Sequence, residues 1–224
     1  MSDRIVILDF GSQFTQLIGR RIRDMHVYCE LLPWHAEKEE ALSADTKGII
    51  LSGGPQSIYA DGAPYIQDYL LESGLPVLGI CYGMQALTHK LGGKVLHSTE
   101  HEYGLTELDV PETNPLLHEG KQIVWMSHGD LVTELPDGFT RLATSPNSPI
   151  AAMMDAANKR FGLQFHPEVH NTQHGEEILR NFVLTICGCQ PGWTSSSIIE
   201  ESVAAIREQV GGGRVLSALS GGVD

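Results

Sequence analysis

Short apolar runs that end in turns, with helical patterns between them, constrain the fold of this chain most strongly. The run at residues 4–9 leads through a glycine turn into apolar positions with helical spacing. Two further runs, at residues 48–51 and 76–80, end in similar turns. Because short buried strands separated by helices are typical of parallel sheets, the sequence predicts an α/β fold. We expect a mostly parallel open sheet flanked by helices.

Residues 95–163 show a different pattern. Their apolar runs are shorter, and proline and glycine interrupt them repeatedly. This pattern predicts antiparallel strands, forming a smaller antiparallel sheet at one edge of the main sheet. A strand-like run at residues 161–165 and helical spacing at residues 176–186 then close the domain near Cys187.

The composition changes again after Cys189. Residues 190–193 have the character of a linker, and the helical pattern that follows reaches Val210 before three glycines break it. A strand-like run at residues 214–219 then ends in a glycine-rich turn without a helix after it. The sequence therefore predicts one domain over residues 1–189 and the start of a second over residues 190–224. We expect the chain to be the first part of a longer protein.

Charge and composition argue against several classes of protein. The formal net charge of −13 over 224 residues, without a run of Lys or Arg, argues against nucleic acid and anionic membranes as partners. The apolar runs are too short for a membrane span, and the N-terminal run is too short for a secretory signal. Four cysteines without such a signal favour a reducing cytoplasm over a disulfide framework.

Cys81 is the strongest candidate for a catalytic nucleophile. It lies between Gly79 and Gly83 where a predicted strand meets a predicted helix, and such glycines permit the strained turn of a nucleophile elbow. The N–H groups at the start of the helix would favour the reactive thiolate. A lone cysteine is more often an inert core residue. The flanking glycines reverse this expectation.

His166 and Glu168 follow the strand-like run at residues 161–165. They offer the base and the orienting carboxylate that a cysteine nucleophile requires, although such a pair alone is more often a solvated strand end. Acyl transfer also needs N–H donors for the oxyanion, and the backbones of Gly54 and Tyr82 are candidates. The alternative interpretation is that Gly54 belongs to an ordinary turn without a role in catalysis.

Three histidines raise the question of a metal. His166, His170 and His174 are four residues apart, as ligands on one helical face would be. Pro167 interrupts such a helix, and the two cysteines at residues 187–189 lack a second ligand pair. We therefore expect no metal site.

Two segments resemble the signatures of class I, triad-type glutamine amidotransferases: residues 79–83 with Gln85, and residues 164–169. The resemblance implies a flavodoxin-like fold in which Cys81 attacks the side-chain amide of L-glutamine. It also implies that His166 moves protons and Glu168 orients His166. The remaining site residues that it implies are Gly54 and Tyr82 in the oxyanion hole, and Gln85, Ser127, His128 and Asp130 near the amino-acid end of glutamine.

Further segments resemble the GMP synthetase family within this class: residues 9–13, 52–55 and 125–130, and the terminal Ser220, Gly221, Gly222, Val223 and Asp224. The terminal segment is similar to the pyrophosphate loop of ATP pyrophosphatases. The resemblance implies a longer enzyme whose synthetase domain uses ATP and Mg²⁺ to aminate xanthosine 5′-monophosphate (XMP). The resemblance is compatible with a homodimer of that longer enzyme. The glutaminase domain needs no cofactor, and we expect this chain to perform glutaminase chemistry alone.

Three alternatives stay open. The chain could be an amidotransferase subunit for carbamoyl phosphate, anthranilate or CTP synthesis, although its terminal segment argues against this. It could be a non-catalytic regulatory or interaction domain in which Cys81 is a redox-sensitive thiol. It could also be a thiol hydrolase for another amide or ester, since triads recur on unrelated substrates.

Overall fold

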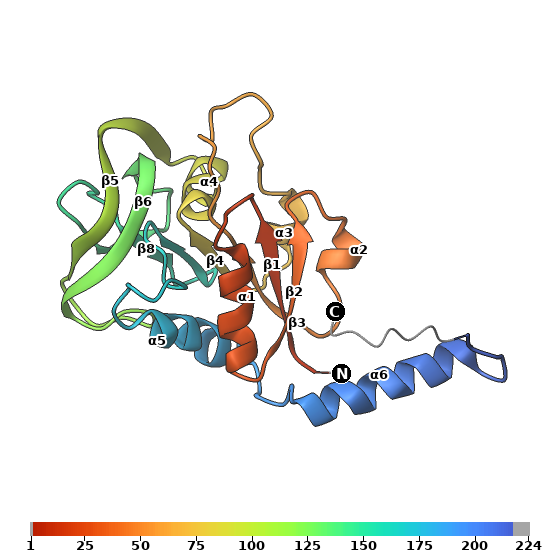
Figure 1. The fold of residues 1–224 in the computed structure, drawn as a ribbon. Helices are drawn as coiled ribbons and strands as arrows, with labels where there is room; N and C mark the ends of the chain where they lie inside the picture. The colour runs from red at the N-terminus through yellow and green to blue at the C-terminus, as the bar shows by residue number, and fades with distance from the viewer. Residues whose placement is uncertain (1, 217–224) are drawn as a thin grey trace.

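A seven-stranded sheet forms the centre of the protein (Figure 1). The computed structural model describes residues 2–216, apart from the side chains of residues 99, 100, 195–198, 201 and 205. The strands of this sheet are β1 (Arg4–Asp9), β2 (Tyr28–Pro33), β3 (Thr46–Leu51), β4 (Val77–Ile80), β7 (Thr140–Ala143), β8 (Ala152–Asp155) and β9 (Arg160–Leu163). Their order across the sheet is β2-β1-β3-β4-β9-β8-β7.

The pairing of these strands confirms the predicted fold class. β2, β1, β3, β4 and β9 are parallel to one another, in the order typical of flavodoxin-like sheets. β8 and β7 pair antiparallel at the edge beyond β9. The carboxyl ends of β4 and β9 therefore lie side by side, which positions the residues that follow each strand.

Helices cover both faces of the sheet. The helical segments are α1 (Thr15–Asp24), α2 (Lys38–Ala41), α3 (Asp68–Glu72), α4 (Tyr82–Lys90), α5 (Gly175–Arg180), its π-helical continuation η1 (Asn181–Ile186), and α6 (Ser195–Val210). Side chains of α1, α5 and η1 join one buried cluster, and side chains of α2, α3 and α4 join another. Two cores therefore lie on opposite faces of one sheet.

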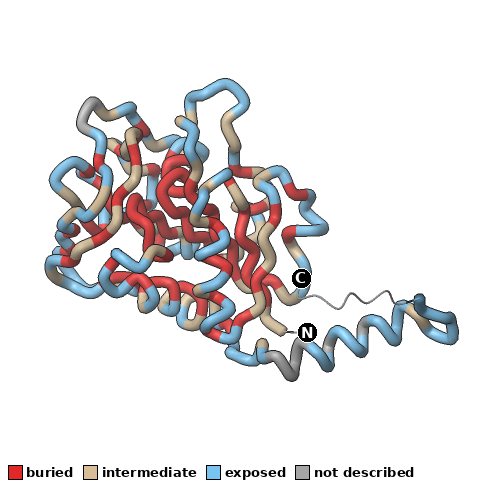
Figure 2. The backbone as a smooth tube through the Cα atoms, in the orientation of Figure 1, coloured by how far each residue is buried: buried red, intermediate tan, exposed pale blue. Residues whose placement is uncertain are grey.

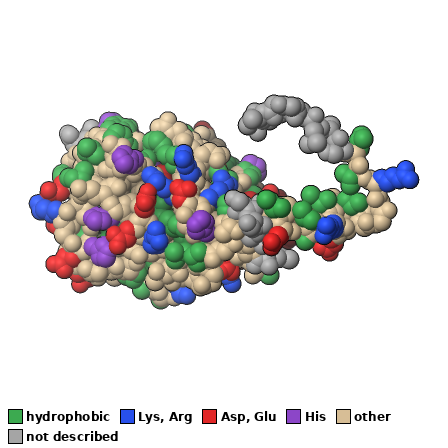
Figure 3. Space-filling model, turned by 60° about the horizontal axis from the view of Figure 1, so that its bottom comes forward, with side chains coloured by type: hydrophobic (Ala, Val, Ile, Leu, Met, Phe, Trp, Pro, Cys, Tyr) green, Lys and Arg blue, Asp and Glu red, His purple; other side chains and the backbone are tan. Residues whose placement is uncertain are grey.

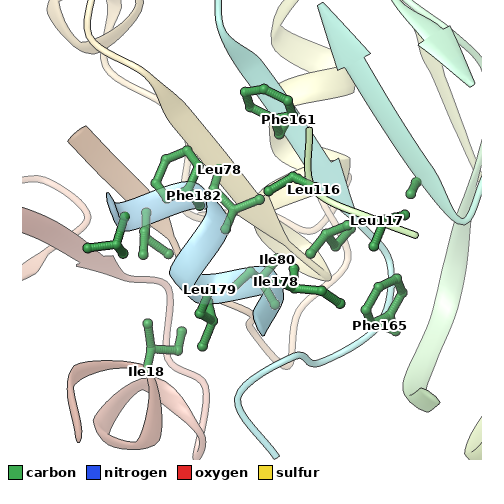
Figure 4. Close-up of a cluster of buried hydrophobic side chains, with 14 of the residues drawn as sticks. Ile18, Leu78, Ile80, Leu116, Leu117, Phe161, Phe165, Ile178, Leu179 and Phe182 are labelled. Carbon is green, nitrogen blue, oxygen red and sulfur yellow. The ribbon is translucent and has the colours of Figure 1, made fainter. Parts of the chain in front are cut away.

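The strand sequences explain these two cores. Successive side chains of a strand point to opposite faces, so a strand covered on both sides must be apolar throughout. In β1, Ile5 and Ile7 belong to the first cluster, whereas Val6 and Leu8 belong to the second. Figure 2 shows buried residues concentrated along these strands, and Figure 4 shows part of the first cluster. Each fully buried side chain of this size contributes about 1.5–3 kcal/mol of transfer free energy.

β5 (Lys94–Val110) and β6 (Gly120–Glu134) form a separate two-stranded antiparallel sheet. This pairing confirms the smaller antiparallel sheet that the sequence predicts, although the apolar runs are short and the two strands contain 17 and 15 residues. Along β6 nearly every second residue is buried, so one face of the strand packs inward over most of its length. The prolines of residues 95–163 lie between strands, whereas most of the glycines lie within them.

The segment after Cys189 connects the sheet to α6. Residues 190–193 contain neither helix nor strand, as the linker prediction implies, but the N–H groups of Gly192 and Trp193 donate to the carbonyl of His26, at 2.9 and 2.8 Å. Exposed apolar side chains, Ile199 and Ile206 among them, lie along α6, where Figure 3 shows hydrophobic atoms.

The structure describes the C-terminal segment only as far as residue 216. The predicted strand at residues 214–219 falls outside the described residues from position 217 onward, and so does the whole pyrophosphate-loop segment at residues 220–224. Among the helices within residues 2–216, none combines the length and the apolar character needed to cross a lipid bilayer.

Candidate active site

Cys81 lies on a strained turn between β4 and α4. Its backbone has φ +51° and ψ −107°, which non-glycine residues rarely adopt, and its N–H donates to the carbonyl of Leu163 at 2.7 Å. A Cβ on Gly79 would lie 2.6 Å from the backbone of Gly83, and one on Gly83 would lie 2.4 Å from the carbonyl oxygen of Leu51. Both glycines are therefore required by close backbone contacts, as the sequence predicts for a nucleophile elbow.

His166 lies between Cys81 and Glu168. Nδ1 of His166 is 2.8 Å from Oε1 of Glu168, and the two side chains are 4% and 0% exposed. The thiol of Cys81 is close enough to the imidazole to raise its pKa, and both residues line one cavity. Nε2 is the ring nitrogen not used by Glu168. The structure thus brings together the three residues that the sequence predicts as a triad.

The surroundings of His166 favour its protonated form. Burial alone would lower the pKa of the ring, but hydrogen bonds to Cys81 and Glu168 outweigh burial and raise the pKa to about 10. A protonated imidazole between a sulfur and a carboxylate can donate a proton to a leaving group. The arrangement is therefore suited to acid–base chemistry at the sulfur.

Contacts from several elements hold the imidazole of His166 in place. Its backbone N–H donates to Trp125 of β6 at 3.0 Å, and its carbonyl accepts the hydroxyl of Thr172 at 2.6 Å. The ring of Phe14 meets it edge to face, with centroids 5.2 Å apart. On the other side, a Cβ on Gly53 would lie 3.1 Å from Cε1. The glycine next to the predicted oxyanion residue thus makes room for the imidazole.

A cavity of about 590 Å³ opens in front of Cys81, large enough for an amino acid. It includes all but one of the predicted oxyanion and glutamine-binding residues. The exception is Tyr82, whose side chain is buried and whose hydroxyl donates to Pro64, so Tyr82 has only its backbone N–H to offer. The lining residues of this set are Gly54, Gln85, Ser127, His128 and Asp130.

The backbone N–H groups of Gly54 and Tyr82 meet the first requirement of an oxyanion hole, since neither has a hydrogen-bond acceptor among the described residues. Gly54 also has to be a glycine, because a Cβ there would lie 2.6 Å from the carbonyl oxygen of Phe10. On the opposite side of the sulfur, the carbonyl oxygen of Ser127 is 3.6 Å from Sγ of Cys81.

Asp130 lines the cavity, and one of its two carboxylate oxygens is unsatisfied. Oδ1 lies 2.8 Å from Nδ1 of His97, whereas the buried Oδ2 has no hydrogen-bond partner among the described atoms. The carbonyl oxygen of Asp130 accepts the amide of Gln85 at 2.7 Å. His128 differs from the other predicted residues, because both of its ring nitrogens already contact groups of the protein.

The sequence prediction missed the contribution of β5 to the cavity. His97, His101 and Tyr103 line it, because β5 pairs with the part of β6 that carries Ser127 and Asp130. Only the register of the hairpin places these residues there, and the segment carries no motif that would reveal it.

The histidines considered as metal ligands lie in different environments. His166 pairs with Glu168 beside Cys81. His174 precedes α5, and its Nδ1 lies 3.3 Å from Oε2 of Glu177. Within the described part of the chain, no group of three or more His, Cys, Asp or Glu residues could hold a metal ion.

Comparison with known families gives a match over residues 6–186 to the model described as glutamine amidotransferase class-I. The chain is 51% identical to the glutamine-hydrolyzing GMP synthase of Aliivibrio fischeri, over 99% of the chain and 43% of that protein. It is 53% identical to the enzyme of the same description from Geobacillus kaustophilus, over 99% of the chain and 44% of that protein. The chain thus spans less than half the length of these curated relatives.

A solved structure agrees with these matches. A Thermoplasma acidophilum protein, described as a candidate GMP synthase subunit, superimposes with a TM-score of 0.73 at 30% sequence identity. The superposition covers 90% of this chain and 98% of that protein.

Proposed function

Since the chain belongs to the class I glutamine amidotransferases, we propose that it releases ammonia from the side-chain amide of L-glutamine through Cys81, His166 and Glu168. One observation carries the proposal: the buried line Glu168–His166–Cys81 ends at the cavity in front of β4 and β9. A nucleophile, a proton donor and an orienting carboxylate in hydrogen-bonding sequence are what acyl transfer from an amide requires.

The first half of the reaction forms a thioester. The sulfur of Cys81 attacks the amide carbon of glutamine, and the N–H groups of Gly54 and Tyr82 stabilise the resulting oxyanion. His166 donates its proton to the departing nitrogen as the C–N bond breaks, so ammonia leaves and a glutamyl thioester remains. The raised pKa of His166 keeps that proton in place until then.

The second half of the reaction restores the enzyme. The now neutral imidazole of His166 takes a proton from water, and the oxygen of that water attacks the thioester carbon. The C–S bond breaks, glutamate leaves and the sulfur of Cys81 recovers its negative charge. Throughout, the carboxylate of Glu168 keeps Nδ1 of His166 oriented, which leaves Nε2 directed at the reacting atoms.

The amino-acid end of glutamine would contact the wall formed by β6 and α4. Asp130 lines the cavity, so an α-ammonium group placed there would pair with its carboxylate through a charge-assisted hydrogen bond. Gln85 and Ser127 also line the cavity and would contribute further polar contacts. His128 would shape the cavity wall, because both of its ring nitrogens already contact the protein.

We further propose that the ammonia serves a synthetase part of a longer polypeptide. The relatives are named glutamine-hydrolyzing GMP synthases, and the chain aligns with less than half of each. In this proposal residues 1–189 form the glutaminase, residues 190–224 lead into the synthetase, and XMP, ATP and Mg²⁺ bind there. Assembly into a homodimer, and a cytoplasmic location, would be properties of that longer enzyme.

Covalent labelling tests the glutaminase proposal directly. The purified chain is incubated with an electrophilic glutamine analogue, and the adduct is located by peptide mass spectrometry. We expect one adduct, on Cys81, which excess glutamine suppresses and which is missing in Cys81→Ser. Cys29 is a built-in control, because burial raises the pKa of its thiol to about 11. Labelling of Cys29 instead, or of neither thiol, would favour the non-catalytic alternative.

The acceptor reaction needs a second experiment. The synthetase part of a curated relative is mixed with this chain, XMP, ATP and Mg²⁺, and GMP formation is measured with glutamine or with ammonium as the nitrogen source. We expect both sources to support GMP formation by the wild-type chain, and ammonium alone to support it with Cys81→Ala. Equal rates from glutamine with and without this chain would refute the acceptor assignment.

A further inference from the structure

Glu102 is a buried carboxylate that the chemistry proposed above does not use. It lies in β5, is 4% exposed, and its oxygens receive hydrogen bonds from three side chains. The hydroxyl of Ser145 lies 2.9 Å from both oxygens, that of Ser148 lies 2.9 Å from Oε2, and Nε2 of His128 lies 3.2 Å from Oε2. Ser145 and Ser148 belong to the connection between β7 and β8. Glu102 therefore ties the hairpin to the edge of the main sheet.

The charge of Glu102 suits this position. Burial alone would raise the pKa of its carboxyl group, but the hydrogen bonds from His128, Ser148 and Ser145 outweigh burial and lower the pKa below its usual value. An ionised carboxylate only accepts hydrogen bonds, so it can serve several donors at once. An amide of the same size would turn an NH₂ group toward one of these donors.

Glu102 also ends an irregular stretch of the hairpin. His97 pairs with Asp130 and Glu102 pairs with His128, so four residues of β5 lie opposite the single residue Gly129. Bulges of this kind bend a strand and redirect its side chains, often beside an active site. Glu102 is the first residue after the bulge at which regular pairing with β6 resumes.

A chain of polar contacts connects Glu102 with Cys81 through His128, Asp130 and Gln85. His128 contacts Glu102 through Nε2, and its Nδ1 lies 3.0 Å from the carbonyl oxygen of Asp130. The same oxygen accepts the side-chain amide of Gln85 at 2.7 Å, and the backbone N–H of Gln85 donates to the carbonyl of Cys81 at 3.1 Å. The buried carboxylate is thus connected to both the cavity wall and the helix that begins after Cys81.

We propose that Glu102 is a positioning residue for glutamine binding, whose carboxylate fixes residues 127–130 of β6 as the wall of the cavity. This inference rests on the proposed glutaminase function. Glu102 does not line the cavity, so it acts through His128 and Asp130 rather than by contact with the substrate. Loss of its charge loosens the wall that holds the amino-acid end of glutamine and leaves the triad intact.

Kinetics of Glu102→Gln test this role, with Glu107→Gln as the matched control. Glu107 lies in the same strand but is exposed, and its partner is Lys121 at 2.6 Å. For Glu102→Gln we expect KM for glutamine to rise by about tenfold or more while kcat changes by less than about threefold. The control should behave as wild type. Ser148→Ala, which removes one of the donors, should raise KM in the same direction but less, and it serves if Glu102→Gln does not fold.

Two chemical probes separate positioning from a general loss of structure. In Glu102→Gln, the electrophilic glutamine analogue should label Cys81 more slowly, whereas iodoacetamide, which needs no amino-acid contacts, should react at the wild-type rate. Amide hydrogen exchange should increase in the peptide covering residues 127–130 and stay unchanged in α4 and β9.

The outcomes discriminate between the two proposals. A lower melting temperature with unchanged KM and unchanged analogue labelling would reduce Glu102 to a structural role and overturn the inference. A fall in kcat with constant KM would overturn it as well. If the wild-type chain neither hydrolyses glutamine nor takes up the analogue, the glutaminase function itself fails, and the inference fails with it.

Discussion

The parallel strands and the β5–β6 hairpin build the same cavity in different ways. Cys81 and His166 follow neighbouring strands, and backbone contacts within a few ångströms fix both. The hairpin contributes Ser127 and Asp130, whose carbonyl oxygens accept hydrogen bonds from side chains outside the hairpin, the thiol of Cys81 and the amide of Gln85. Backbone contacts therefore fix the reacting groups, whereas hydrogen bonds from side chains fix the groups proposed to bind the substrate.

The glycines of the two regions differ in the atoms that surround them, backbone atoms in the first region and side-chain atoms in the second. A Cβ on Gly79 would meet the backbone of α4 at 2.6 Å, and the backbone there has no room to move. A Cβ on Gly129 of β6 would lie 2.8 Å from Nδ1 of His101, which belongs to a side chain that can turn away. The strand-to-helix turn is therefore rigid, and the hairpin can adapt.

Replacement of Cys81 should have the largest effect. Cys81→Ala removes the nucleophile without adding volume, so we expect the rate of ammonia release from glutamine to fall by about 10⁴-fold or more. The melting temperature should stay close to that of wild type. Residual activity within tenfold of wild type would mean that the rigid region does not carry the reaction.

Replacement of Glu168 should rank second. Glu168→Gln keeps the volume but loses the carboxylate that pairs with Nδ1 of His166, so we expect kcat to fall by about 10²-fold. The pKa of His166 should drop below its value of about 10, which NMR titration of the imidazole can measure. An unchanged pKa would show that Cys81 alone holds the proton on His166.

The raised pKa of His166 also predicts how stability depends on pH. A group whose pKa is higher in the folded state stabilises the fold fully below its unfolded pKa and loses that contribution as the pH rises through the folded pKa. We therefore expect the unfolding free energy of wild type to decrease between about pH 6.5, the reference value for histidine, and about pH 10. Denaturation at several pH values should show a smaller decrease for Glu168→Gln.

Gly79→Ala should damage the rigid region through its backbone contacts. Because the new Cβ would meet the start of α4, we expect the free energy of unfolding to fall by about 2–3 kcal/mol. Chemical denaturation measures this change directly. A loss below about 0.5 kcal/mol would show that the turn can yield after all.

Gly129→Ala should have the smallest effect, since His101 can turn aside. We expect the free energy of unfolding to change by less than about 1 kcal/mol and KM for glutamine by less than about threefold. If this substitution proves as damaging as Gly79→Ala, the proposed contrast between a rigid turn and an adaptable hairpin is wrong.

The sequence predicts the rigid region well because its signals are local. Gly79, Cys81 and Gly83 lie within five residues, and His166 directly follows an apolar run, so neighbouring residues reveal both. The same runs predict that the strands are parallel, whereas their order across the sheet comes from the structure. Glu102 and His97 could not be found in this way, because their neighbours in space are 26 and 33 residues away and only the hairpin register brings them together.

The linker contact at His26 has a consequence for how such domains are combined in evolution. His26 precedes β2, so the chain leaves the domain near the amino ends of the parallel strands, whereas the cavity lies at their carboxyl ends. If residues 1–189 form a domain as proposed, a gene fusion at that exit would add a partner far from Cys81 and His166. The proposed glutaminase would then be recombined as a unit, with its reacting groups inherited intact.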